Sequence, residues 1–226
     1  MKKTFPTTIV LSLMVLLLSF NLQGKDFKGV VTYKITYPGA ELTPQMQTMM
    51  PKMMTYYVKG DMAKTVIDMG NMGQQMQIMN GNSKTIYNLF DMMGQKFYTV
   101  TTKTEIEEEL EKEPEPQIDY IDEIKEIAGY DCKKAVITID KNGEKNSFIV
   151  YYTSELGSKA LNFDNPYFND IDGLLMEFEM LEGQFKMKLE AVEVHKKNVK
   201  DSEFEIPEEF QEKTKEELRQ SFGGGM

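Results

Sequence analysis

Apolar residues alternate with polar ones along most of the chain, and this period of two constrains the fold more than any other feature. In residues 27–37, apolar side chains recur at the odd-numbered positions Phe27, Val31, Tyr33, Ile35 and Tyr37. Side chains two apart lie on the same face of a strand, so the pattern predicts a strand with one buried face. Further strands are predicted at residues 55–59, 63–69, 74–79, 84–90, 96–102, 132–140, 147–153, 174–181 and 185–196.

Short turns separate these strands. Residues 59–61, 70–73, 80–82, 91–94 and 141–144 are clusters of glycine, asparagine and aspartate, which favour tight turns. Short strands on short turns are typical of an antiparallel meander, here of about eleven strands. One longer loop is expected at residues 154–172. The sequence therefore predicts a mainly β protein with a single domain at residues 25–222.

Two segments interrupt the β pattern. Residues 104–117 are acidic and end in two prolines, which predicts a solvated helix or linker. Pro207 suits a first helical position, and apolar or small residues then recur every four positions at Phe210, Thr214, Leu218 and Phe222. We expect a C-terminal helix that begins at Pro207 and docks on the sheet. Three glycines follow it, and residues 223–226 are predicted to be a disordered tail.

The N-terminus has the composition of a leader. Lys2 and Lys3 precede an apolar run at residues 9–20 and a polar exit that ends at Gly24. This order predicts a signal peptide at residues 1–24. The run has about a dozen residues, whereas a membrane-spanning helix needs roughly 20. No cysteine lies near Gly24 for lipid attachment. We expect a periplasmic or secreted protein without a transmembrane segment after leader removal.

The charge of the chain argues against nucleic acid as a partner. The sequence has 26 basic and 36 acidic residues, a formal net charge of −10, and loss of the two leader lysines takes this to −12. An acidic surface repels phosphate backbones. The only arginine, the residue best suited to bidentate phosphate contacts, is Arg219.

The sequence contains few residues suited to catalysis. His195, the only histidine, lies in an alternating strand, where we expect it to be exposed. No zinc-ligand spacing, nucleophile elbow or phosphate-binding loop occurs. A glycosidase-like carboxylate pair is the one catalytic alternative. Cys132 has no partner for a disulfide, and its segment favours a small buried residue over a reactive thiol. We therefore predict a non-enzymatic protein without a metal or cofactor.

Methionine is concentrated in one region. Twelve of the 18 methionines lie between Met46 and Met93. Thr43 can cap and Pro44 can open a helix carrying Met46, Met49, Met50, Met53 and Met54, which Pro51 breaks or kinks near Met50. Three interpretations remain open: methionines that fill a core, a pliable lid over an apolar groove, and thioether coordination of Cu(I).

The order of elements resembles the LolA/LolB-like periplasmic lipoprotein carriers. It is most similar to uncharacterised exported families grouped with that fold, through the segment Ile127-x-Gly129-Tyr130-x-Cys132-Lys133 and the closing Val199-x4-Phe204-x-Ile206-Pro207. The resemblance implies a strongly curved antiparallel sheet, an open half barrel with short helices over its concave side, which can hold acyl chains. The carriers use an arginine inside the cavity, whereas Arg219 lies near the C-terminus here. The resemblance thus implies the fold and an apolar cavity more than lipoprotein transport.

Two main functional hypotheses follow. In the first, the half barrel binds a hydrophobic ligand such as a lipid or a lipoprotein acyl chain. The predicted lid and wall residues are Met46, Met49, Met50, Met53, Tyr33, Ile35, Tyr56 and Val58. In the second, the chain is a cell-envelope structural or interaction protein that fills its own cavity and meets another envelope protein through residues 105–115 or 162–172. Cu(I) binding by the methionines is a third hypothesis.

Overall fold

The computed structural model describes residues 27–92, 94–141, 143–182 and 185–221. The predicted signal peptide at residues 1–24, Phe222 and the predicted tail at residues 223–226 lie outside these ranges. The predicted single domain at residues 25–222 stays a prediction.

The N-terminal part is an antiparallel meander with one helical insertion. The helix α1 is held between the first two strands, and a single turn of 3₁₀ helix, η2, joins β3 to β4. The elements are β1 (Lys28–Thr36), α1 (Pro44–Met49), β2 (Met53–Lys59), β3 (Met62–Asp68), η2 (Gly70–Met72), β4 (Gly73–Asn80), β5 (Thr85–Met92) and β6 (Gln95–Thr101).

A second meander follows the helix α2, and the chain then returns to the first meander. The elements are α2 (Lys103–Leu110), β7 (Gln117–Ile127), β8 (Tyr130–Lys141), β9 (Glu144–Thr153), η3 (Lys159–Leu161), β10 (Leu174–Glu182), β11 (Phe185–Lys196), η4 (Asp201–Phe204), β12 (Gln211–Glu212) and α3 (Lys215–Ser221). In the described part of the chain, no helix is long and apolar enough to span a membrane.

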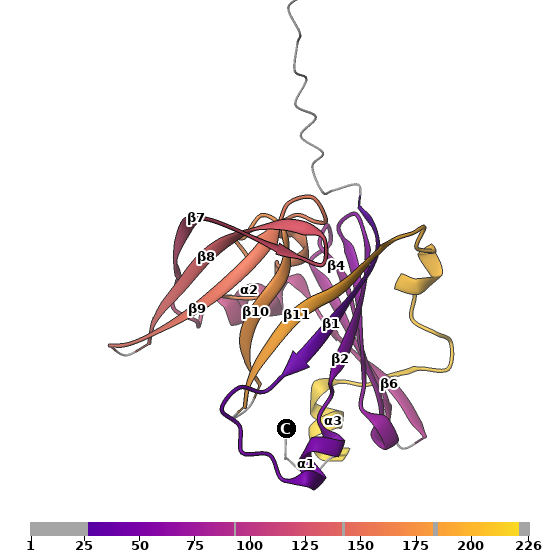
Figure 1. Cartoon of the computed structure of the whole chain (residues 1–226). Coiled ribbons are helices and arrows are strands. Elements are labelled where there is room, and N and C mark those ends of the chain that lie inside the picture. Colours follow the sequence, from indigo (N-terminus) through magenta and orange to yellow (C-terminus); the bar gives the residue numbers. More distant parts are fainter. Residues whose placement is uncertain (1–26, 93, 142, 183–184, 222–226) are drawn as a thin grey trace, which may run out of the picture.

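All twelve strands join in one sheet. The order is β12-β6-β5-β4-β3-β2-β1-β11-β10-β9-β8-β7, antiparallel except where β12 pairs with β6. β1 pairs with β2 on one side and β11 on the other, so it joins the two meanders (Figure 1). The sheet is curved and does not close, because β12 and β7 remain as its edges. This confirms the predicted mainly β, curved antiparallel fold.

The Tyr33 hydroxyl shows how strongly the centre of the sheet bends. Tyr33 lies on β1, and its hydroxyl donates a 2.8 Å hydrogen bond to the carbonyl oxygen of Leu175 on β10. β11 lies between these two strands in the sheet. A side chain can reach the backbone two strands away only where the sheet curls over it. Tyr33 is 2% exposed, within the largest core cluster.

The β pattern did not reveal β7. This strand is an edge of the sheet, and all but one of its residues are exposed or only partly buried. Its charged sequence does not alternate clearly, since one face is not fully covered. Ala128 and Gly129 connect it to β8 with φ of 51° and 82°. Left-handed geometry at both central residues is that of a tight two-residue hairpin, which explains the Gly129 of the motif quoted above.

The predicted start of the C-terminal helix at Pro207 is wrong. Phe210 is buried against Ile78 and Leu89, and β12 pairs with β6 before α3 begins. The actual start has a capping box, in which the Thr214 hydroxyl accepts from the Glu217 amide (3.1 Å) and the Glu217 carboxylate accepts from the Thr214 amide (2.7 Å). Phe210, which precedes β12, and Leu218 of α3 therefore do not share a helix. The acidic segment near 104–117, by contrast, does contain a helix, α2.

Candidate functional site

A cavity of about 590 Å³ lies on one side of the curved sheet. Small-molecule sites are typically about 300–1,000 Å³. Its wall comes from four strands of the first meander, from β10 and β11, from α1 with the residues after it, and from the loop between β9 and β10. The cavity is thus built where the two meanders meet, around β1.

The lining is mainly apolar and rich in methionine. Thioethers are flexible and polarizable, and therefore adapt to ligands of varied shape. The methionines of the lining are Met46, Met49, Met50, Met54, Met69, Met76, Met79, Met180 and Met187. Two of them come from β10 and β11, so the methionine surface is not confined to the cluster at Met46–Met93.

Six of the eight residues predicted for the lid and wall line this cavity. Tyr33 and Ile35 contribute from β1, and Tyr56 from β2. Met46 and Met49 contribute from α1, and Met50 from the position that follows it. Whether any of them contacts a ligand stays a prediction.

Met53 and Val58 do not line the cavity. Met53 is the first residue of β2 and is 45% exposed, because strand alternation directs it to the face opposite Met54 and Tyr56. Val58 shares the face of Tyr56 but is fully buried in the core beyond the cavity. Met53 was assigned to the lid because its spacing also fits a helix, but β2 has already begun there.

The helix α1 is short and fixed at both ends. The Thr43 hydroxyl accepts a hydrogen bond from the Met46 amide at 3.3 Å, and Pro44 occupies the first turn. Met50 is the C-cap in an extended conformation, as expected before Pro51. The predicted helix that breaks near Met50 is confirmed. The Tyr37 hydroxyl donates to the Pro51 carbonyl oxygen at 2.8 Å, which ties the end of α1 to the residue after β1.

No residue of α1 is buried, and its apolar side chains lie between cavity and solvent. Met49 lines the cavity and is also 46% exposed. It therefore lies at the mouth. A helix of six residues without a buried side chain has little packing to hold it in place, and such segments are the ones that open at low free-energy cost.

The loop between β9 and β10 supplies a side of the cavity that the sequence analysis did not identify. The Asn162 amide donates to the carbonyl oxygens of Ile171 (2.9 Å) and Gly173 (3.0 Å), and Asn162 is buried. The Asn165 side chain accepts from the amides of Tyr167 (2.9 Å) and Phe168 (3.2 Å). These asparagines were the available signal, since asparagine organises irregular loops. This loop was considered as a partner surface, whereas its apolar residues line the cavity.

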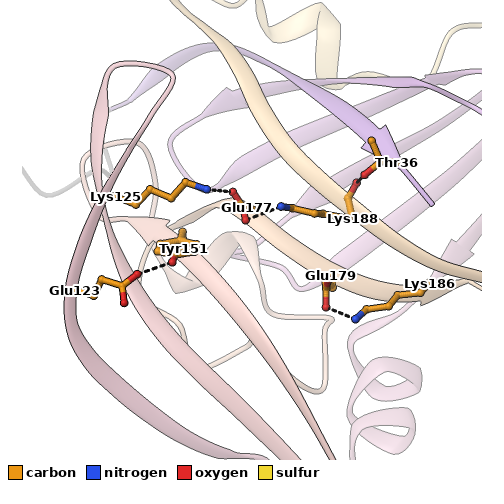
Figure 2. A network of polar contacts seen from close by, with 8 residues as sticks. All are labelled: Thr36, Glu123, Lys125, Tyr151, Glu177, Glu179, Lys186 and Lys188. Carbon is orange, nitrogen blue, oxygen red and sulfur yellow. Dashed lines mark hydrogen bonds and ion pairs between the residues drawn. The ribbon is translucent and has the colours of Figure 1, made fainter. Parts of the chain in front are cut away.

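One face of β10 and β11 is apolar and lines the cavity, whereas the other face carries charged side chains. Phe178 and Met180 of β10 line the cavity, while Glu177 and Glu179 alternate with them and point away. Glu177 accepts from Lys125 (2.5 Å) and Lys188 (2.8 Å), as Figure 2 shows. The register between β9 and β10 shifts between Leu175 and Glu177, as at a β-bulge.

This outer charge network holds the cavity strands together. Lys125 belongs to β7, so Glu177 links β7, β10 and β11. Burial alone would raise the pKa of the Glu177 carboxyl, but its hydrogen bonds to Lys125 and Lys188 outweigh burial and lower the pKa. A second pair, Glu179–Lys186, joins β10 and β11 at 2.6 Å (Figure 2).

The residues considered for catalysis lie outside the cavity lining. Cys132 is fully buried, and burial raises the pKa of its thiol to about 11. It fits the small buried residue that the sequence favoured. The His195 side chain is 59% exposed and lies 2.8 Å from Glu193, as a residue on the outside of a strand. Within the described ranges, no three His, Cys, Asp or Glu side chains gather in a group that could hold a metal ion.

The sequence of the chain matches one known protein family. The sequence profile of the family described as "Domain of unknown function (DUF4412)" matches residues 27–162. This range contains β1 to β9, α1 and the first residues of the β9–β10 loop. No curated protein matches the chain.

Two solved structures are similar over most of the chain, at low identity. LprF from Mycobacterium bovis is 13% identical, covers 76% of this chain and 87% of its own, and superposes with a TM-score of 0.31. A β-barrel-like protein of the domain of unknown function DUF1849 from Brucella abortus is 8% identical, covers 76% and 99%, and has a TM-score of 0.35.

Proposed function

The chain belongs to the DUF4412 family, and we propose that it is an exported, non-enzymatic binding protein that holds a lipid or other acyl chain in its cavity. The observation that carries this proposal is the cavity of about 590 Å³ with a wall rich in methionine. The free energy of the system falls when an apolar ligand displaces water from the apolar surface of such a space.

The geometry supports a binder more than a protein that fills its own cavity. A protein that filled its own cavity would leave little free volume there, because side chains pack protein interiors closely. A volume of about 590 Å³ corresponds to about 20 molecules of liquid water at about 30 Å³ each. Such a space on the inner side of a curved sheet is also what the resemblance to the LolA/LolB-like carriers implies, and we propose that this family shares their architecture.

Copper binding receives less support. The spacing that suggested it runs from Met46 to Met53, but Met53 points away from the cavity that Met46, Met49 and Met50 line. The proposed ligand is therefore organic.

Burial of about ten methylene groups of an alkyl chain contributes about 8 kcal/mol to binding, equivalent to a Kd of about 1 μM. We expect micromolar or weaker affinity, because association itself opposes binding.

The test is uptake of the neutral dye Nile red by lid variants. Met49→Asp and Met50→Asp place a carboxylate at the mouth, and we expect each to weaken dye binding about tenfold or more, since charge is poorly tolerated against apolar surface. Folding should be unaffected, because neither Met49 nor Met50 is buried.

Met53→Asp is the matched control. Met53 and Met49 are similarly exposed, at 45% and 46%, but only Met49 lines the cavity. Dye binding should survive Met53→Asp. Equal loss in all three variants, or in none, would remove α1 from the mechanism, and no dye binding by the parent protein would contradict the proposed function.

A further inference from the structure

One ionisable group in the cavity wall stands out from its surroundings. Asp164 lies in the loop between η3 and β10 and is partly buried. It is the only Asp, Glu, Lys, Arg or His among the described residues that line the cavity. Tyr56, on β2, also lines the cavity, and the charge of Asp164 raises the pKa of Tyr56 in addition to the effect of burial. Asp164 and Tyr56 thus line the same cavity.

Several other polar groups of the wall form hydrogen bonds within the protein. The Tyr33 hydroxyl donates to the Leu175 carbonyl oxygen, and the Asn162 amide donates to two carbonyl oxygens. The Asn165 side chain accepts from two backbone amides. These hydrogen bonds shape the wall.

Asp164 and Tyr56 differ from them. In the described part of the chain, the Asp164 carboxylate is hydrogen-bonded only to its own backbone amide, and no lysine or arginine forms an ion pair with it. The Tyr56 hydroxyl has no hydrogen-bond partner there. No buried polar side-chain atom of the described residues lacks a partner, so the Tyr56 hydroxyl must reach accessible surface, and Tyr56 lines the cavity.

We infer that the cavity selects its ligand by the polar end: Asp164 accepts a hydrogen bond from an ammonium or hydroxyl headgroup, and ligands that end in a carboxylate or phosphate are disfavoured. This inference rests on the proposed function. It specifies the class of ligand as an alkyl chain with a hydrogen-bond donor and without negative charge.

The physical reason is the uncompensated charge of the cavity. Two like charges that lie close together in a partly buried site repel each other more strongly than they do in bulk water. No cation of the described lining offsets this repulsion. An ammonium group instead gains the same attraction, and a hydroxyl donates without a charge. Burial raises the pKa of the Asp164 carboxyl, as expected for an acid that lacks a cationic partner.

The experiment compares three ligands with the same alkyl chain: dodecylamine, 1-dodecanol and dodecanoate. Each is titrated against Nile red bound to the protein at about pH 8, where the amine is protonated and the carboxylate ionised. We expect dodecylamine to bind at least about tenfold more tightly than dodecanoate. We also expect 1-dodecanol to bind more tightly than dodecanoate.

Asp164→Asn removes the charge and keeps the shape of the side chain. The preference for dodecylamine over dodecanoate should then fall to within about threefold, while the affinity for 1-dodecanol changes less than the affinity for either charged ligand. Asp170→Asn is the matched control, since Asp170 lies in the same loop, is exposed and does not line the cavity. This variant should keep the preference of the parent protein.

Each of the following outcomes overturns the inference. Dodecanoate binding as tightly as dodecylamine to the parent protein would do so without any variant. If the preference for dodecylamine persists in Asp164→Asn, or disappears equally in Asp170→Asn, the overall acidic surface and not Asp164 would be its cause. Failure of all three ligands to displace Nile red would also contradict the proposed function, whereas a reversed order with tight binding would leave that function intact.

Discussion

Replacing Tyr33 with phenylalanine tests whether the curl of the sheet is held as described. The hydroxyl of Tyr33 bridges from β1 to the Leu175 carbonyl oxygen on β10, over the intervening β11. The ring would keep its edge-to-face contacts with Tyr56 and Phe178, both at 6.2 Å between centroids. The substitution therefore removes one hydrogen bond and leaves a buried carbonyl without that donor.

Leaving a buried acceptor unsatisfied costs about 1–3 kcal/mol of unfolding free energy. For a domain of this size, 1 kcal/mol changes the Tm by about 2–4 °C, so we expect Tyr33→Phe to lower the Tm by roughly 2–12 °C. Urea unfolding followed by circular dichroism measures the same loss as a lower midpoint at unchanged slope.

Tyr56→Phe is the matched control, because Tyr56 is also buried but its hydroxyl has no partner among the described residues. Its effect on stability should stay within about 0.5 kcal/mol. Equal stability of the two variants would refute the reasoning, since it would show that the bond from β1 to β10 does not hold the curved sheet.

Two further predictions concern titration and thiol chemistry. Hydrogen bonds from Thr102 and Lys215 lower the pKa of Glu105 from 4.5 to about 2. Glu105 therefore contributes stability above about pH 4.5, and this contribution is lost as the pH falls towards 2. Glu105→Gln should flatten this part of the curve of unfolding free energy against pH, and an unchanged slope would contradict the role of these hydrogen bonds. The Cys132 thiol is buried, and its pKa is raised to about 11. We therefore expect Ellman's reagent to leave Cys132 unmodified at about pH 8 in the native protein and to modify it after denaturation. Prompt reaction of the native protein would show that Cys132 is accessible.

The period of two predicted the strands that have one buried face. β1, for example, follows the predicted alternation at Val31, Tyr33 and Ile35, all buried. Strands without this contrast were not found: β7 is an exposed edge, and β12 has two exposed residues. The capping signals at Thr43 and Pro44 located α1, since capping depends on neighbours in sequence.

The candidate site was predicted only in part, because it depends on which distant strands meet. The lid and β1 are local in sequence, and their residues could be proposed from spacing. The contribution of Phe178, Met187 and Asp164 depends on β1 pairing with β11 and on the loop that precedes β10. Strand parity gives two faces but does not say which one lines the cavity. Nor does it say how far along that face the cavity extends: Val58 shares a face with Tyr56 but lies in the filled core.

The claim that the cavity binds a ligand is tested most directly by native mass spectrometry of the protein purified from its native source. The mass of the native protein is compared with the mass of the denatured chain. We expect an excess of several hundred daltons that organic solvent removes, and a bound molecule that carries an amine or hydroxyl rather than a free acid. A native mass equal to that of the bare chain, in a protein that also fails to take up Nile red, would contradict the claim that the cavity binds a ligand, and an excess of one copper ion would assign the methionines to a metal instead.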